Sequence, residues 1–119
     1  MFGRKSKSER LRDLTGEGAL EEALEADLAV IYKHSPFCPT SARAIREVQS
    51  FTQRKPEVPV YMVDVIRSRA LSQRLASDLG IQHQSPQAIV VRKGQPTAHG
   101  SHYDVTVDQL ERWCSGAAE

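Results

Sequence analysis

The sequence predicts an α/β domain built on one mixed four-stranded sheet with helices on both faces. The first half supports this because two short, nearly all-apolar segments, 28–32 and 58–65, flank a stretch of helical periodicity. Strand, helix and strand with short connections form a βαβ unit, in which the two strands run parallel. In the second half, residues 87–102 have the pattern of a β-hairpin and one more helix follows. The length of 119 residues suits a single domain of this kind.

Composition and charge argue against several classes of protein. Apolar residues make up 39% of the chain and charged residues 26%, and the net charge is +1. Such a chain has no overall attraction to nucleic acid or to anionic membranes. No apolar stretch is long enough to span a bilayer, and the N-terminal residues lack the apolar core of a signal peptide. We therefore expect a cytoplasmic monomer without nucleic-acid or membrane partners.

The N-terminal part divides into a basic segment and a short helix. Residues 1–13 carry five basic side chains and little apolar content. We interpret them as a disordered, solvated tail that precedes a domain at 14–119. Within 18–26, Leu20 and Leu24 recur at helical spacing with acidic residues elsewhere, which predicts an amphipathic helix.

The centre of the predicted sheet comes next. Residues 28–32 are apolar and rich in β-branched side chains, as expected of a strand covered on both faces. Helical spacing begins at Pro39 and ends before Lys55. Residues 58–65 then form a second apolar strand, parallel to the first.

A helix, a hairpin and a helix complete the chain. Leucines recur every four residues through 71–79, and Gly80 is placed to end that helix. Strands are predicted at 87–92 and 96–102, with a turn at 93–94. The last helix presents one apolar face, which holds Val107, Leu110, Trp113 and Cys114.

These elements predict one strand order. The 58–65 strand lies at one edge, followed by the 28–32 strand, the 87–92 strand and finally the 96–102 strand. The first two strands run parallel, and the 87–92 strand runs antiparallel to its neighbour in the centre.

Cys38 lies where the first strand meets the first long helix, in the segment KHSPFCPTS. Ligands bind at this edge of open α/β sheets. The N–H groups of a first helical turn have no intrahelical partners, and their partial positive charge favours a thiolate over a thiol. Pro39 suits the first helical position because its missing N–H would have no partner there. We therefore interpret Cys38 as a reactive thiol, to which His34 adds positive charge if it points inward.

Three other interpretations of Cys38 are weaker. A small, buried core cysteine normally sits inside an apolar run, whereas this one lies among serine, proline and threonine. A cysteine–histidine hydrolase needs a third, orienting residue, and none is evident. A site formed with any of the four histidines lacks recognisable ligand spacing, so we expect no metal.

Ser41 stands three residues after Cys38, where many redox proteins carry a second cysteine. It lies on the same face of the first turn and can donate a hydrogen bond to the thiolate, but it forms no disulfide. Cys38 would attack a disulfide, keep one half of it and wait for an external thiol, which is monothiol chemistry. The other cysteine, Cys114, falls on the core face of the last helix, and we do not expect it to act as the resolving thiol.

The order of elements and the position of Cys38 together match the thioredoxin arrangement, so we predict a thioredoxin-like α/β fold. The sequence also resembles the bacilliredoxins, specifically the YtxJ-like monothiol members found in bacteria that use bacillithiol. The resemblance rests on KHSPFCPTS (33–41), YMVDVIRSRALSQRLASDLGI (61–81) and HQSPQAIVVRKG (83–94). With the spacing between these segments, it extends from about Leu20 to the C-terminus.

The resemblance implies that Cys38 removes bacillithiol from thiolated client proteins. The client thiol would leave reduced, and bacillithiol would act as co-substrate, with no tightly bound cofactor. Pro86 is then expected to follow a cis peptide bond and to face Cys38. The backbone of Ser85 is expected to pair with the incoming disulfide much like an added strand. His34 and Pro39 complete the expected substrate-binding residues.

The leading interpretation is thus a thiol–disulfide oxidoreductase that acts in redox homeostasis. Two other functions remain as alternatives. A carrier of the monothiol-glutaredoxin kind would hold an iron–sulfur cluster with one protein thiol and one small thiol. Pro39 and the lack of a glycine after Cys38 disfavour it. A thioredoxin-like binding module with an idle thiol would show an ordinary Cys38 pKa.

Overall fold

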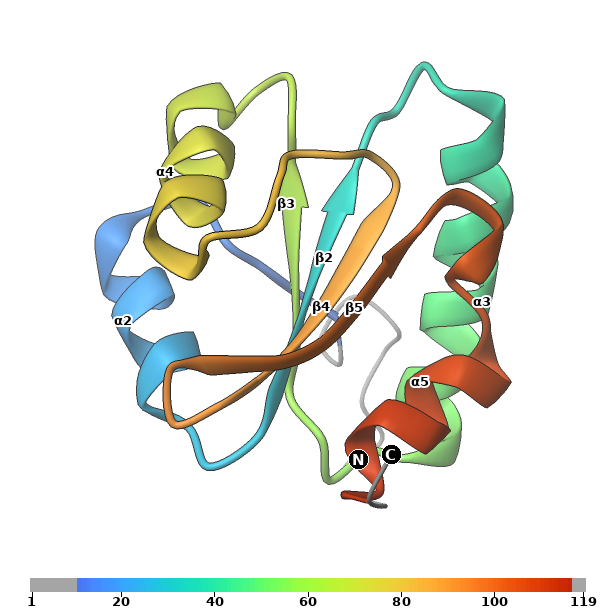
Figure 1. Cartoon of the computed structure of the whole chain (residues 1–119). Coiled ribbons are helices and arrows are strands. Elements are labelled where there is room, and N and C mark those ends of the chain that lie inside the picture. The colour runs from blue at the N-terminus through green and yellow to red at the C-terminus, as the bar shows by residue number, and fades with distance from the viewer. Residues whose placement is uncertain (1–10, 117–119) are drawn as a thin grey trace, which may run out of the picture.

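A mixed sheet of five strands forms the centre of the molecule, and helices cover both of its faces (Figure 1). The computed structural model describes residues 11–116. The order across the sheet is β1-β3-β2-β4-β5. The strands are β1 (Leu11–Asp13), β2 (Ala29–His34), β3 (Val60–Asp64), β4 (Gln87–Arg92) and β5 (Gln95–Ser101).

Two helices lie on each face of the sheet. In Figure 1, α2 and α4 cover one face, and α3 and α5 cover the other. A short 3-10 turn, η1, connects β5 to α5. No helix within residues 11–116 is long and apolar enough to cross a bilayer. The bounds are α2 (Glu17–Glu25), α3 (Pro39–Arg54), α4 (Arg69–Leu79), η1 (His102–Asp104) and α5 (Val107–Cys114).

Strand β2 occupies the middle of the sheet and is buried on both sides. It pairs in parallel with β3 and antiparallel with β4. Successive side chains point to opposite faces. Tyr32 therefore packs in the core below α3 and α5, whereas Ile31 packs in the core below α2 and α4. The predicted parallel and antiparallel pairings of the central strand are confirmed.

The predicted helices are confirmed, and their ends have local causes. Helix α3 begins with Pro39 at its first position. Helix α4 ends at Gly80, whose φ of 67° lies in the left-handed region that glycine adopts without cost. Helix α5 begins after Thr106, whose hydroxyl oxygen accepts a hydrogen bond from the Gln109 N–H.

Strand β1 corrects two predictions. We expected four strands with the 58–65 strand at an edge, but Leu11–Asp13 pairs in parallel with β3 and places β3 inside the sheet. The expected tail at 1–13 is therefore wrong for residues 11–13, and 1–10 lie outside the described residues. The physical reason is the burial of Leu11 and Leu14 against the sheet. A strand of three residues is too short to show a period of its own.

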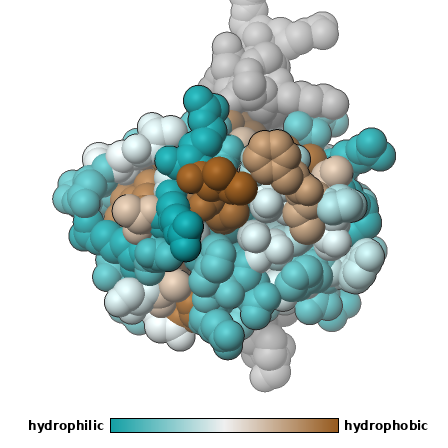
Figure 2. Space-filling view, turned by 90° about the horizontal axis from the view of Figure 1, so that it is seen from above, coloured by the Kyte–Doolittle hydropathy of each residue, from teal (hydrophilic) through white to brown (hydrophobic). Residues whose placement is uncertain are grey.

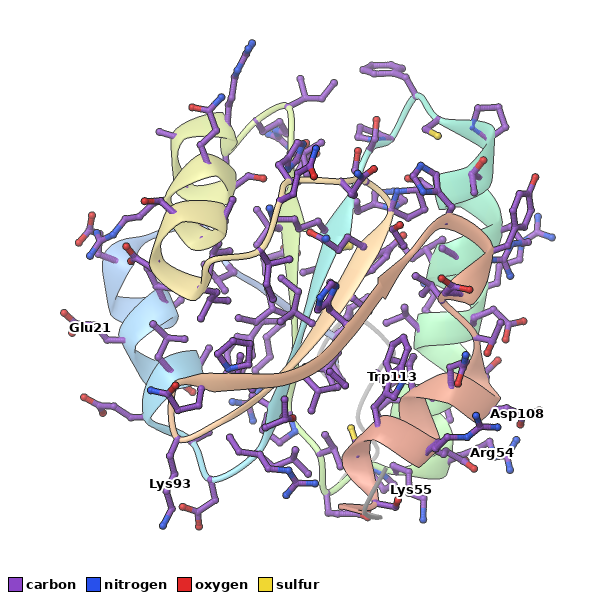
Figure 3. The ribbon with its side chains drawn as sticks, in the orientation of Figure 1. Glu21, Arg54, Lys55, Lys93, Asp108 and Trp113 are labelled. Carbon is purple, nitrogen blue, oxygen red and sulfur yellow. The ribbon has the colours of Figure 1, made fainter. Side chains whose placement is uncertain are left out.

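The hairpin turn at Lys93–Gly94 is confirmed, with positive φ values of 51° and 81° at its two residues. Lysine is an unusual residue in that conformation, and a contact from elsewhere in the fold supports it. The Lys93 N–H donates to the carbonyl oxygen of Ala26 at 3.0 Å, just past the end of α2. The turn in Figure 3, marked by Lys93, is thus tied to the helix that packs beside it.

Trp113 closes the core between α5 and β5. In Figure 3 its ring points from α5 toward the strand. A Cβ at Gly100 of β5 would lie 2.7 Å from Cη2 of this ring and 3.0 Å from the Asp104 Cβ. Glycine is therefore needed at this position for close approach, not for an unusual backbone conformation.

We expect Gly100→Ala to lower the free energy of unfolding by about 1–3 kcal/mol, because the ring or the strand must move. Chemical denaturation of the variant and the wild type measures the difference. Gly18→Ala is the matched control, since a Cβ there meets nothing within 4 Å and alanine favours helix α2. Equal stabilities for Gly100→Ala and the wild type would show that the Trp113 contact is not close packed.

Candidate active site

Cys38 lies at the start of α3, four residues after the end of β2. It is the N-cap residue of the helix and has an extended backbone, with φ −103° and ψ 123°. Its own N–H donates to the Ser35 carbonyl at 3.1 Å, which closes the loop, and its carbonyl accepts from the Ala42 N–H at 3.1 Å. The thiol is half-exposed. The predicted position of Cys38 at a strand–helix junction is confirmed.

The first turn of α3 favours the thiolate form of Cys38. Its sulfur makes no capping hydrogen bond of ordinary geometry, but the N–H groups of Ser41 and Thr40 face it. The Ser41 N–H is the largest cause of the lowered Cys38 pKa. Burial, the second-largest effect, opposes it, and the Thr40 N–H and both hydroxyls add to the lowering. Hydrogen bonds to the charged form are thus the main cause, as the sequence argument expected.

Ser41 is fully buried beside the loop that carries the thiol. Its Oγ accepts a hydrogen bond from the Ser35 N–H at 3.2 Å. The hydroxyl proton is then free to bond to the Cys38 sulfur, which is one of the causes of the lowered Cys38 pKa. Ser41 therefore links the loop conformation to the charge on the sulfur.

A buried tyrosine connects β2 to this site. The Tyr32 hydroxyl lies 2.9 Å from the His34 Nδ1 and 3.3 Å from the carbonyl oxygen of Ser41. Burial is the largest cause of its raised pKa, so the phenol stays protonated. The sequence offers no sign of a site role for Tyr32, because a tyrosine inside an apolar run is expected to be a core residue.

His34 does not supply the positive charge that the sequence allowed for. The imidazole is half-buried, and desolvation lowers its pKa, although the nearby Asp64 carboxylate acts in the opposite direction. Asp64 itself accepts hydrogen bonds from the N–H groups of Ile66 and Arg67, which hold its pKa below the usual range. The ring is therefore neutral near pH 7, and its role in substrate binding stays a prediction.

The segment before β4 runs beside the end of β2. The Ser85–Pro86 peptide bond is cis, and Pro86 is buried. Gln87 pairs with Lys33, which places Ser85 and Pro86 next to the loop that leads to Cys38. The Pro86 carbonyl oxygen accepts a hydrogen bond from the His102 N–H at 2.9 Å, so it is already used within the fold.

Exposed apolar side chains gather at this edge of the sheet. Strands β2, β3 and β5 all end there, and the segments after them carry Phe37, Ile66 and Tyr103. Their exposed fractions are 82%, 53% and 72%, which are high for such side chains. Figure 2 looks down on this end of the molecule and shows hydrophobic groups surrounded by polar surface. Such a patch beside a reactive thiol suits contact with another protein.

Arg43 holds part of this surface in place. Its Nη2 donates to the carbonyl oxygens of His102 at 2.9 Å and Val105 at 3.2 Å. Its guanidinium also lies over the Tyr103 ring, 5.2 Å from the centroid. The arginine thereby fixes η1 against the first turn of α3.

Comparison with known proteins identifies the family. The sequence matches the monothiol bacilliredoxins, BrxC, over residues 11–110. The chain belongs to the monothiol bacilliredoxin family. The structure is similar to that of an oxidoreductase with a thioredoxin fold, with a TM-score of 0.83 and 26% identity, covering 88% of this chain and 94% of that one. The predicted family and thioredoxin-like fold class are thus confirmed.

Two thioredoxins share the fold of this bacilliredoxin at lower identity. Mitochondrial thioredoxin 3 from Saccharomyces cerevisiae is 16% identical, with a TM-score of 0.73, and the match covers 94% of this chain and all of that one. Thioredoxin from Trypanosoma brucei brucei is also 16% identical, with a TM-score of 0.73 and coverage of 87% and 86%. The family and the fold together support a thiol oxidoreductase.

Cys114 lies at the other end of the bacilliredoxin molecule. It is the last residue of α5, which Figure 1 places opposite to the end where α3 begins. The thiol packs against the core below α3 and α5. Burial raises the Cys114 pKa to about 11, although the Arg92 charge opposes the shift. The predicted packing of Cys114 against the core is confirmed.

Lys33 is a buried charged residue whose place the sequence argument missed. Its side chain is fully buried on the α4 side of the sheet, and its Nζ lies 3.1 Å from the His83 Nδ1. Desolvation lowers the Lys33 pKa to about 8. The signal in the sequence is a lysine that directly continues an apolar run, where alternation turns it into the core.

We expect Cys38 to react with iodoacetamide at least about tenfold faster than Cys114 near neutral pH. The Cys38 pKa lies below its usual 9.0 and that of Cys114 is about 11, so their thiolate fractions differ by more than about 100-fold. The lower nucleophilicity of the more acidic thiol removes up to about a factor of ten. Timed labelling and peptide mass spectrometry measure both rates in one sample, and equal rates would contradict an activated Cys38.

We expect Lys33→Met to raise the free energy of unfolding, because it removes a buried charge. This gain should shrink as the pH rises from about 8 to about 10.5. Across this interval the unfolded chain keeps a proton on Lys33 that the folded protein has released, so the wild type becomes more stable. Below it, both states hold the proton and the cost of burial is constant. The difference between the two proteins should change by up to about 3 kcal/mol. Denaturation at several pH values measures it, and a constant difference would mean that Lys33 titrates normally.

Proposed function

We propose that this bacilliredoxin removes bacillithiol from protein mixed disulfides, with Cys38 as its one working thiol. The observation that carries the proposal is the environment of Cys38. The thiol is half-exposed, its pKa is lowered by donors of the first turn, and a buried serine stands where a resolving cysteine would be. The binding module with an idle thiol is disfavoured, because its cysteine would have an ordinary pKa.

The reaction consists of two thiol–disulfide exchanges. In the first, the Cys38 thiolate attacks the bacillithiol sulfur of the mixed disulfide, a new S–S bond forms to Cys38, and the client sulfur leaves as a thiolate. In the second, the thiolate of another bacillithiol attacks the bound bacillithiol. This step releases bacillithiol disulfide and restores the Cys38 thiolate. Each exchange forms one S–S bond and breaks one, so no net oxidant is required.

Ser41 and Thr40 give Cys38 two roles in this cycle. Their N–H groups and hydroxyls stabilise the thiolate that attacks in the first exchange. The same donors stabilise Cys38 when it becomes the leaving group in the second exchange, and a thiol with a lower pKa leaves faster. One set of hydrogen bonds therefore serves both exchanges.

Recognition of the client combines apolar surface with backbone pairing. Phe37, Ile66 and Tyr103 offer exposed apolar contact around the thiol. The backbone of Ser85, in the segment before β4, is the group that we assign to pair with an extended client segment. Pro39 and His34 border the same loop and complete the proposed substrate-binding residues.

The test uses a client protein that carries bacillithiol on a single cysteine. Incubation with the wild type should free the client thiol and leave a Cys38–bacillithiol adduct that persists until fresh bacillithiol is added. Cys38→Ala should abolish the reaction, and Ser41→Cys should release bacillithiol as an internal disulfide forms. Intact-protein mass spectrometry follows every species.

Cys114→Ala is the control for the monothiol assignment. It should leave both the rate of client release and the lifetime of the adduct unchanged, because Cys114 lies at the opposite end of the molecule (Figure 1). A longer adduct lifetime in Cys114→Ala would identify Cys114 as a resolving thiol. Release of the client by Cys38→Ala would show that the reaction does not pass through Cys38.

A further inference from the structure

A group of basic side chains lies around a cavity between α4 and the segment before β4. The cavity has a volume of about 280 Å³. The group consists of Arg69 and His83, which line the cavity, and Lys33, whose Nζ contacts His83 from behind. The lining residues are Val65, Ile66, Arg69, Ser72, Gln73 and His83.

Lys33 is a buried cation without a buried counter-charge. Its side chain is fully buried, and its partner is the neutral acceptor nitrogen of His83. Among residues 11–116, no carboxylate lies within ion-pair distance of Lys33. Buried charged groups are normally paired, because an isolated ammonium is costly to remove from water. The positive charge of Lys33 is therefore uncompensated, and a negatively charged ligand nearby would stabilise it.

The hydrogen bond from Lys33 sets the chemical form of His83. An ammonium only donates, so Nδ1 must accept and the ring proton lies on Nε2. Ser72 Oγ is also near Nδ1, at 3.3 Å. Desolvation lowers the His83 pKa, and the Lys33 and Arg69 charges lower it further, so the ring is neutral. His83 thus keeps an Nε2–H donor, and the Arg69 guanidinium provides more.

The cavity lies at the same edge of the sheet as Cys38. The Val65 N–H donates to the His34 carbonyl at 2.9 Å, and His34 ends the strand that leads to Cys38. His83 lies two residues before Ser85, in the segment that leads into β4, whereas Val65 follows β3 on the other side of β2. Helix α4, which supplies Arg69, Ser72 and Gln73 to the cavity, and helix α3, which begins after Cys38, cover opposite faces of the sheet, so the end of β2 lies between the cavity and the thiol (Figure 1). A thiol the size of a tripeptide spans about 10 Å when extended.

We propose that this cavity binds a carboxylate of the small thiol that Cys38 removes from client proteins. Arg69 and the His83 Nε2–H donate to the carboxylate, and Lys33 acts as a positioning residue that fixes the His83 tautomer and supplies positive charge from behind. The inference rests on the proposed function, since it assigns the binding of the small thiol to the same edge of the sheet.

A small thiol is the occupant that fits these observations. The cavity accommodates a carboxylate-bearing fragment, whereas the exposed apolar groups of the patch offer contact area for a protein. Ile66 belongs to both, because it lines the cavity and is one of the exposed apolar residues. A mixed disulfide could therefore place its protein half on the patch and its small half in the cavity.

The kinetic test compares two clients that differ in the attached thiol. One carries bacillithiol, which has carboxylates, and the other carries 2-mercaptoethanol, which is neutral. We expect Arg69→Gln and Lys33→Met each to raise KM for the first client about tenfold, as for loss of one charge-assisted hydrogen bond, with little change in kcat. The rates on the 2-mercaptoethanol client should not change.

Arg67→Gln is the matched control, because Arg67 is an exposed arginine two residues before Arg69 that does not line the cavity. It should leave the preference between the two clients unchanged. An equal loss on both clients in Arg69→Gln would indicate a structural role and overturn the proposal. An unchanged preference would overturn it as well. In both cases the proposed function would stand, because stripping by the wild type is measured in the same experiment.

A binding measurement tests ligand binding in the cavity separately from the proposed reaction of Cys38, because it requires no catalysis. S-methyl bacillithiol keeps the carboxylates but has no thiol to exchange. Its titration should shift the His83 ring resonances in the wild type and bind about tenfold more weakly to Arg69→Gln. Absence of any His83 shift would overturn the proposal. Equally tight binding of succinate would assign the cavity to free dicarboxylates and overturn the small thiol as its occupant.

Discussion

The rest of the structure depends on the burial of β2 between two layers of helices. A strand covered on both faces must lie inside the sheet, so it needs a neighbour on each side, and β3 and β4 fill those places. Its C-terminal end then opens at the edge where the first turn of α3 begins. Cys38 meets the free N–H groups of that turn because the chain has to pass from the buried strand to the helix there. The position of the reactive group is thus a consequence of core packing.

Hydrogen bonds, and not a nearby formal charge, favour the thiolate. His34 is neutral, and Arg43 is used to hold η1 against α3. The donors that lower the Cys38 pKa belong to Thr40 and Ser41, which are fixed by the helix itself. Backbone and hydroxyl donors adjacent in the chain are less sensitive to salt than exposed ion pairs. The acidity of Cys38 is therefore tied to the folding of one helical turn.

The sequence predicted those features that repeat or that stand at a junction. Strands β2 to β5, the helices and the place of Cys38 follow from apolar runs, the hairpin pattern, helical spacing and Pro39. Strand β1 was missed because three residues have no period, and the edge position of β3 was wrong for the same reason. The sites of Lys33 and Tyr32 were missed because their partners, His83 and the Ser41 carbonyl, are brought close by the fold alone.

Strand β1 protects the molecule from a particular kind of self-association. Without Leu11–Asp13, the outer side of β3 would present its unpaired N–H and C=O groups along an almost wholly apolar strand. Such an edge can template pairing with a second chain. The opposite edge, β5, is less open to this, since it carries Pro96 and an irregular register beside β4. Three residues without a strand pattern of their own therefore cover the β3 edge of the sheet. A shortened version of the chain should begin before them.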